Sequence, residues 1–265
     1  CQNLVKSMFS DKEFSNQINM SGVNSINWAR IIAQSVYYFY CYFLAEDDNQ
    51  PINFSVPTGN FGDVYAGYLA KKLGLPINKL IVATNQNDIL HRAISKGKYE
   101  TEHVSETISP SMDIQIASNF ERLIYDLNNH DSSQTLDDMK NIKQNGKYTI
   151  DDEKLKKINQ DFLSARMSEQ ETLDVIKNIY EKFNMVLDPH TAIGYGAFDK
   201  HDLKGKNIVL ATAHPCKFPD AILKAINLKS DLPDELKFIL DEKENYGIIE
   251  NNLKEIKQYI LGKIK

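Results

Sequence analysis

The chain has 265 residues, of which 42% are hydrophobic and 25% are charged. These proportions are ordinary for a globular protein and allow a core that needs no disulfide or structural metal. The net charge of −5 lacks the basic excess of nucleic-acid binders, so we expect no nucleic-acid partner.

The cysteines and the apolar runs exclude further classes of protein. Cys1, Cys41 and Cys216 are scattered and form no CxxC pair, and the six histidines show no ligand spacing, so we expect neither disulfides nor a metal site. This cysteine usage favours a reducing compartment, and we expect the cytoplasm. The longest apolar run, residues 36–44, is too short to span a bilayer, so we expect no membrane partner.

The first part of the chain is predicted to form a long helix followed by a βαβ unit. Apolar residues recur every three or four positions over residues 28–44, which indicates a helix that Ser25 can cap. Residues 52–56 and 79–85 are typical of strands, and the second suits a buried parallel strand. A helix over about 63–73, ended by a glycine, connects them.

The rest of the chain is predicted to be mostly helical, with one more strand at residues 207–212. Residues 130–151 are polar and are expected to form an exposed connection. Ser168 and Glu171 have the spacing of a capping box. The expected helices cover residues 87–95, 113–128, 169–183 and 219–226, a segment beginning at Asp188, and the charged tail after Leu232.

These elements predict an α/β protein whose strands end in loops that lead into helices, and ligands of such sheets bind at those strand ends. The loop at residues 57–63, Pro-Thr-Gly-Asn-Phe-Gly-Asp, is one candidate. Its glycines let several N–H groups point inward, and the following helix adds its positive end, which suits a phosphate group. The alternative is a glycine-rich turn that holds no ligand.

Two other segments carry side chains suited to a ligand. Small residues over 210–218 would let a flat ring approach the backbone, where Thr212 offers a neutral hydroxyl, although an ordinary strand-to-helix turn is the alternative. Amides, a hydroxyl and Arg30 gather over residues 23–30 and could bind a dianion. The alternative there is a helix capped by Ser25, with Arg30 in solvent.

The three segments, together with four others, resemble threonine synthase of the longer-chain type found in fungi and bacteria. The matching motifs occur in the family's order and run from about residue 9 to residue 218. They are Asn-Ser-Ile-Asn-Trp-Ala-Arg (24–30), Pro-Thr-Gly-Asn-Phe-Gly-Asp (57–63), Leu-Ile-Val-Ala-Thr-Asn-Gln-Asn-Asp-Ile-Leu (80–90), Ser-Pro-Ser-Met-Asp-Ile (109–114), Ser-Asn-Phe-Glu-Arg (118–122), Asp-Pro-His-Thr-Ala (188–192) and Ala-Thr-Ala-His-Pro-Cys-Lys-Phe (211–218).

The resemblance implies fold type II of pyridoxal-phosphate (PLP) enzymes, the tryptophan-synthase-β type, with parallel strands in a three-layer αβα arrangement. It implies PLP as the cofactor, with Thr212 as the hydroxyl partner of its pyridine nitrogen. The PLP phosphate would be held by Gly59, Asn60, Phe61, Gly62 and Asp63.

The resemblance also implies a lyase of threonine biosynthesis that converts O-phospho-L-homoserine and water to L-threonine and phosphate, acting as a monomer or homodimer. Asn24, Ser25 and Arg30 would grip the substrate phosphate. Two alternatives stay open. One is a related phospholyase that acts on another phosphorylated amino alcohol or amino acid. The other is a non-catalytic homologue that binds a phosphorylated ligand or serves as a scaffold.

The resemblance divides the chain into four functional segments. Residues 1–112 would belong to the cofactor-binding large domain with the phosphate loop, and residues 113–187 would be a mostly helical insertion. Residues 188–232 would return to the large domain with the pyridine-side strand, and residues 233–265 would form a C-terminal helical tail.

The family's Schiff-base lysine lies in a segment upstream of every motif matched here, and no motif in this chain resembles that segment. Lys71 and Lys72 lie far along the helix that follows the loop, and the family does not place its catalytic lysine at Lys217. We therefore expect that the N-terminal segment is absent, that this chain alone is inactive, and that a full-length protein is active.

Overall fold

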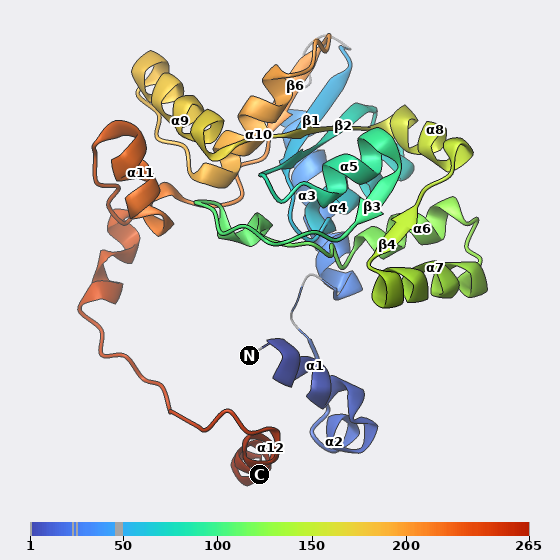
Figure 1. Ribbon diagram of the computed structural model, residues 1–265. Coiled ribbons are helices and arrows are strands. Elements are labelled where there is room, and N and C mark those ends of the chain that lie inside the picture. The colour runs from blue at the N-terminus through green and yellow to red at the C-terminus, as the bar shows by residue number, and fades with distance from the viewer. Residues whose placement is uncertain (1, 23, 25, 46–49, 265) are drawn as a thin grey trace. The chain divides into compact units, whose positions relative to one another are not determined.

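The computed structural model describes residues 2–22, 24, 26–45 and 50–264 (Figure 1). The chain divides into two compact units. One contains Cys1–Asn24 and Leu232–Lys265, and the other contains Ser25–Asp231.

Four parallel strands form the main sheet of the larger unit, in the order β5, β2, β1, β6. They are β1 (Ile52–Pro57), β2 (Ile77–Thr84), β5 (Phe162–Arg166) and β6 (Lys206–Val209). In the register of the sheet, Phe54 of β1 lies between Leu80 of β2 and Ile208 of β6. β1 and the second half of β2 are buried on both faces, as is typical of parallel sheets covered on both sides.

Side chains of β2 alternate between two cores, one on each face of the sheet. Leu80 and Val82 belong to the larger core, which α4 (Gly62–Lys72) and α5 (Ile89–Lys96) cover. Ile81 and Ala83 belong to a smaller core under α10 (Pro189–Asp199). Helices therefore lie on both faces of the sheet (Figure 1), and the predicted three-layer αβα fold is confirmed.

The remaining elements of the larger unit surround these layers. α3 (Trp28–Ala45) packs against α4, and α9 (Glu169–Phe183) packs against α10. The others are the antiparallel pair β3 (Lys98–Glu100) and β4 (Lys147–Thr149), the helices α6 (Phe120–Leu127), α7 (Ser132–Asn145), α8 (Asp152–Asp161) and α11 (Pro219–Ile226), and the 3-10 turns η1 (Pro110–Met112) and η2 (Pro215–Lys217).

The smaller unit contains α1 (Gln2–Ser10), α2 (Lys12–Gln17), the 3-10 segment η3 (Asp234–Leu240) and α12 (Leu253–Lys263). Lys257 of α12 forms an ion pair with Asp11 and lies over the ring of Phe14, 5.0 Å from its centroid. The C-terminal tail, predicted to be helical, is helical only in part, because residues 241–252 form no helix. Across the residues that the structure describes, no helix combines the length and apolar character needed to cross a bilayer.

Local signals in the sequence predicted several element ends correctly. The Ser168 hydroxyl accepts a hydrogen bond from the Glu171 N–H while the Glu171 carboxylate accepts from the Ser168 N–H, which is the predicted capping box. Asp188 caps α10 with its side chain. α3, α4, α5 and α11 lie within a few residues of their predicted bounds.

The predictions between residues 113 and 187 were wrong in part. Residues 130–151 are largely exposed, as expected, but they are more than a connection, because they form α7 and β4. Asp131 caps α7, and only Thr135 and Ile142 of that helix are buried. Residues 113–119 are not helical. The segment also supplies β5, an edge strand of the main sheet that was not predicted. In addition, the predicted strand 207–212 ends early, at Val209.

Candidate active site

The loop between β1 and α4 leaves a row of backbone N–H groups without acceptors. α4 has no side-chain cap, since Phe61 stands at its N-cap position. The N–H of Thr58 donates to the carbonyl of Ala83, 2.8 Å away. Beyond it, within the described part of the chain, no hydrogen bond is donated by the N–H groups of Gly59, Asn60, Phe61 and Gly62. A helix start with free donors suits an anion.

Phe61 anchors this loop by its side chain and shapes it by its backbone. Its ring is 1% exposed and lies 5.2 Å from the ring of Phe120 and 5.8 Å from that of Phe162. Its φ angle is +66°, a left-handed conformation that is rare for a bulky residue. The aromatic core therefore holds the loop in a conformation that its own backbone disfavours, and strain of this kind is concentrated at functional sites.

A second segment lies directly against the loop and makes glycine necessary at position 59. A Cβ on Gly59 would lie only 2.4 Å from the carbonyl oxygen of Ser111. The segment with Ser111 is fixed by the carboxylate of Asp113, whose Oδ1 accepts from the side-chain amides of Asn85 (2.8 Å) and Asn87 (2.9 Å). The polar residues after β2 thus fix one wall of the loop.

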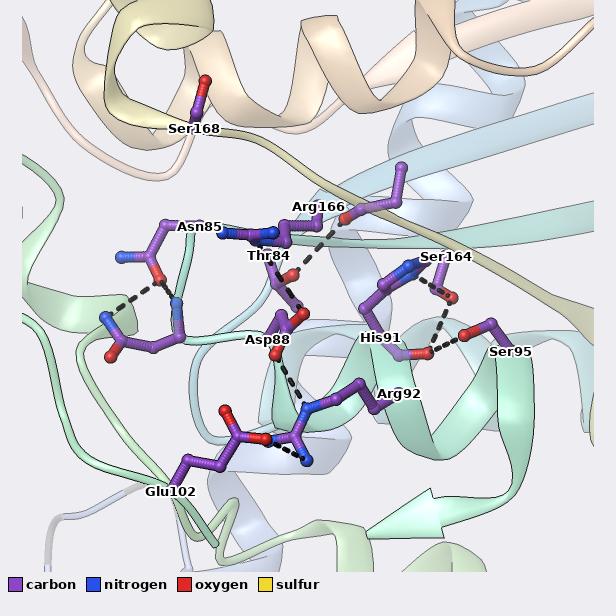
Figure 2. A network of polar contacts seen from close by, with 12 residues as sticks. Thr84, Asn85, Asp88, His91, Arg92, Ser95, Glu102, Ser164, Arg166 and Ser168 are labelled. Atoms are coloured by element: carbon purple, nitrogen blue, oxygen red, sulfur yellow. Dashed lines mark hydrogen bonds and ion pairs between the residues drawn. The ribbon is translucent and has the colours of Figure 1, made fainter. Parts of the chain in front are cut away.

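The charged residues that follow β2 form a separate network. Figure 2 shows Arg92 between two carboxylates: its Nε donates to Asp88 Oδ1 at 2.8 Å and its Nη1 lies 3.1 Å from Glu102 Oε1. Arg166 Nε lies 3.8 Å from Asp88 Oδ2. These charges pair with one another, and none of the four residues lines the loop cavity.

The loop opens into a cavity of about 260 Å³ that the turn after β6 also lines. The predicted loop residues and Thr212 therefore lie around one cavity, although their segments are some 150 positions apart in the chain. The other lining residues were given no binding role from the sequence, although all of them except Gln34 lie in segments or motifs that were singled out there. They are Gln34, Pro57, Thr58, Ser111, Met112, His190, Ala213, Lys217 and Phe218.

Two lining residues have a buried polar atom that lacks a partner among the described residues: Gln34 Oε1 and His190 Nε2. His190 is 4% exposed, and its Nδ1 lies 3.1 Å from Asp188 Oδ1. Burial would raise the pKa of Asp188, but hydrogen bonds from His190 and Thr191 outweigh it and lower that pKa. A carboxylate at Nδ1 leaves Nε2 available for a further polar group.

Asp63, in the first turn of α4, is the acidic group of this cavity. Burial raises the pKa of Asp63 to about 6, and a hydrogen bond from Tyr38 only partly offsets that rise. The group therefore changes charge near neutral pH. An anion should bind at the loop more tightly when Asp63 is neutral than when Asp63 is ionised.

The lysines near the loop are placed differently from one another. Lys71 pairs with Asp161 at 2.7 Å and Lys72 with Asp126 at 3.1 Å, and neither lines the cavity. Lys217 does line it.

The third predicted segment is only partly described. Arg30 is exposed on α3 and does not line the loop cavity, Asn24 belongs to the other compact unit, and Ser25 lies outside the described residues. The Ala29 N–H donates to Asn27 Oδ1 at 2.9 Å, so Asn27 caps the start of α3. A larger cavity of about 1070 Å³ is lined by Trp28, Tyr65 and Arg122 among others, and by none of the predicted site residues that the structure describes.

Comparisons with known proteins agree with one another. The family model "Threonine synthase, C-terminal" matches residues 191–260. Threonine synthase of Saccharomyces cerevisiae is 44% identical over 94% of this chain and 54% of its own length. That of Pseudomonas aeruginosa is 40% identical over 98% of this chain and 56% of its own length.

Solved structures give the same result. The crystal structure of PLP-bound threonine synthase from Brucella melitensis is 45% identical, with a TM-score of 0.93 over 98% of this chain and 56% of that one. The yeast threonine synthase structure has a TM-score of 0.88 at 41% identity. The chain spans about half the length of the relatives it matches. In sequence and in fold, this chain is therefore similar to threonine synthases over nearly all of its own length.

Proposed function

We propose that this chain binds the phosphate of PLP at the loop Gly59–Asp63 and supplies one part of a threonine synthase active site. The observation that carries the proposal is the set of free N–H donors at the start of α4, in one cavity with Thr212. A relative of known structure, the threonine synthase of Brucella melitensis, is PLP-bound. Bound PLP supplies a sink for the negative charge that develops on a substrate carbon.

The residues present fit such a ligand. Gly59, Asn60, Phe61 and Gly62 would donate their N–H groups to the phosphate, and the orphaned Gln34 Oε1 and His190 Nε2 would gain polar partners. The close contact between Gly59 and Ser111 leaves the loop backbone no room for a side chain. Thr212 would place a neutral hydroxyl at the ring nitrogen, so that the nitrogen stays largely unprotonated and the ring withdraws electrons moderately.

The substrate in this proposal is O-phospho-L-homoserine, and the products are L-threonine and phosphate. Asn24, Ser25 and Arg30 would hold the substrate phosphate by charge-assisted and neutral hydrogen bonds. The lysine that carries the cofactor is assigned to a part of the polypeptide outside these 265 residues. Residues 1–112 and 188–232 would form the cofactor-binding part. We also propose a cytoplasmic enzyme, monomeric or homodimeric, without nucleic-acid or membrane partners.

Binding of vitamin B6 phosphates tests the loop. Pyridoxine 5′-phosphate is the suitable probe because it has no aldehyde that could react with surface lysines. Isothermal titration should show at least tenfold tighter binding than for pyridoxine, which lacks the phosphate. Gly59→Ala should lose that preference, because its Cβ would meet the Ser111 carbonyl. Gly262→Ala is the matched control, since nothing lies within 4 Å of a Cβ there. Equal affinity for pyridoxine 5′-phosphate and pyridoxine would show that the loop does not bind the phosphate.

The reaction is tested separately with a polypeptide that also contains the lysine-bearing segment. Product analysis with O-phospho-L-homoserine should show threonine and phosphate, and other phosphorylated amino acids should be poorer substrates. Preference for another phosphorylated substrate would favour the phospholyase alternative instead.

A further inference from the structure

α3 exposes an apolar face that no other described element of the larger unit covers. Seven large apolar side chains on it are 44% to 71% exposed. They are Trp28, Ile32, Val36, Tyr37, Tyr40, Phe43 and Leu44, and we call them the outer face of α3. Helical spacing places them on one side, opposite the buried Ile31, Ser35 and Tyr38. A helix that is apolar all round is normally buried, so the outer face requires a partner.

The sheet has an open edge next to this helix. Within the described chain, β6 pairs only with β1, so its other side presents unpaired backbone groups. A groove of about 630 Å³ runs between the two elements, lined by Tyr37, Tyr40 and Cys41 of α3 and by residues 209–212. An unpaired strand beside an apolar helix is the surface that a further strand and its covering layer complete.

This groove joins the loop cavity. Gln34, Asp63 and Thr212 line both spaces. A segment that fills the groove therefore comes within reach of the loop cavity, and it can place side chains there.

We propose that the outer face of α3 and the free edge of β6 are the docking surface for the remainder of a threonine-synthase-length polypeptide, which adds a strand to β6 and an apolar layer over α3. The relatives that this chain matches are nearly twice its length, since it covers 54% and 56% of them. A contiguous apolar surface with one charge, Arg30, in the 18 residues of α3 suits an obligate intramolecular type of interface. The inference does not depend on the cofactor assignment.

Complementation in trans tests the surface. The probe is the part of the Pseudomonas aeruginosa threonine synthase that this chain does not match, co-expressed with a tag. Size-exclusion chromatography with light scattering should show a 1:1 complex. The double variant Val36→Lys/Tyr40→Lys should abolish it. Phe183→Lys/Met185→Lys is the matched control, because both side chains are 56% exposed at the end of α9, and it should leave the complex intact.

A covalent fusion covers the case in which the probe does not fold alone. The same part is joined ahead of this chain, where the resemblance places the lysine-bearing segment. Maleimide labelling of Tyr40→Cys, read at that position by mass spectrometry, should be at least tenfold slower in the fusion than in the chain alone. Phe183→Cys should react equally in both.

Two results would overturn the proposal. One is labelling of Tyr40→Cys at the same rate in the fusion and in the chain alone. The other is a homodimer of the chain that persists when the probe is added and that Val36→Lys/Tyr40→Lys dissociates. In that case a second copy of the chain would be the occupant of the surface.

Discussion

The hydroxyl of Tyr38 donates to Asp63 at two positions, the backbone carbonyl oxygen at 2.9 Å and carboxylate Oδ1 at 3.2 Å. Tyr38 lies on the buried side of α3, and Asp63 lies in the first turn of α4. The contact therefore connects the helix with the unpartnered outer face to the start of the candidate phosphate loop. It also lowers the pKa of Asp63 against the larger effect of burial.

Removing that hydroxyl should destabilise the protein and shift the titration of Asp63. Tyr38→Phe loses a buried hydrogen bond, which costs roughly 1 kcal/mol of unfolding free energy. It should also raise the pKa of Asp63 further. Urea denaturation at pH 7.5 measures the first effect. Tyr40→Phe is the control, because Tyr40 is 64% exposed and its hydroxyl should contribute little. Equal stability of the two variants would contradict the expected role.

The charge on Asp63 should make stability depend on pH between about 4 and 6. Its folded pKa of about 6 lies above the ordinary aspartate value of 3.8, so the folded state binds the proton more tightly. Stability should fall as pH rises through this window and stay level above it. Asp63→Asn should remove that fall. Because the Asp63 side chain is partly exposed, the free energy of unfolding of Asp63→Asn at pH 7.5 should exceed that of the unsubstituted chain by on the order of 1 kcal/mol.

Urea denaturation across pH 4 to 8 tests this, with Asp113→Asn as the comparison. Asp113 accepts hydrogen bonds from Asn85, Asn87 and Thr107, so its replacement should lower stability at neutral pH. A pH profile of Asp63→Asn that parallels the unsubstituted chain would show that Asp63 is not the titrating group.

His190 should contribute to ligand binding more than to stability. Its Nε2 has no partner among the described residues, so His190→Gln sacrifices only the Asp188 contact and ring packing on Phe218, 4.9 Å away. We expect the affinity for pyridoxine 5′-phosphate to fall about threefold to tenfold, in line with one lost hydrogen bond to a charged group. His103→Gln, an exposed position away from the cavity, should bind normally. Unchanged affinity of His190→Gln would remove His190 from the site.

Ser168→Ala should lower the free energy of unfolding by about 1 kcal/mol, as replacement of an N-cap serine usually does. The variant removes the hydroxyl that accepts from the Glu171 N–H and donates to Glu171 Oε2 at 2.7 Å, while the bond from the residue 168 backbone N–H to the Glu171 carboxylate remains. Ser132→Ala is the control: Ser132 is the first residue of α7, which Asp131 caps. Thermal or urea denaturation should separate the two variants, and equal loss in both would argue against a specific cap.

The sequence alone determined the features that depend on neighbours within a few positions. Local hydrogen bonding and backbone freedom produce the capping box of Ser168, the cap at Asp188 and the glycine-rich loop after β1. Each of these features therefore has a short sequence pattern that predicts it. The order of the motifs also indicated the similarity to threonine synthases that the comparisons show.

Only the tertiary structure decided which distant residues meet at the loop. His190 was read as part of a helix start and Gln34 as an interior helix position, yet both line the cavity, because the sheet brings the helices that carry them to one strand end. Likewise β5 and α7 have little apolar signal of their own: α7 buries only Thr135 and Ile142, and β5 is defined by its pairing with β2. Burial against elements far away in the chain is a property of the packed molecule, and no local pattern specifies it.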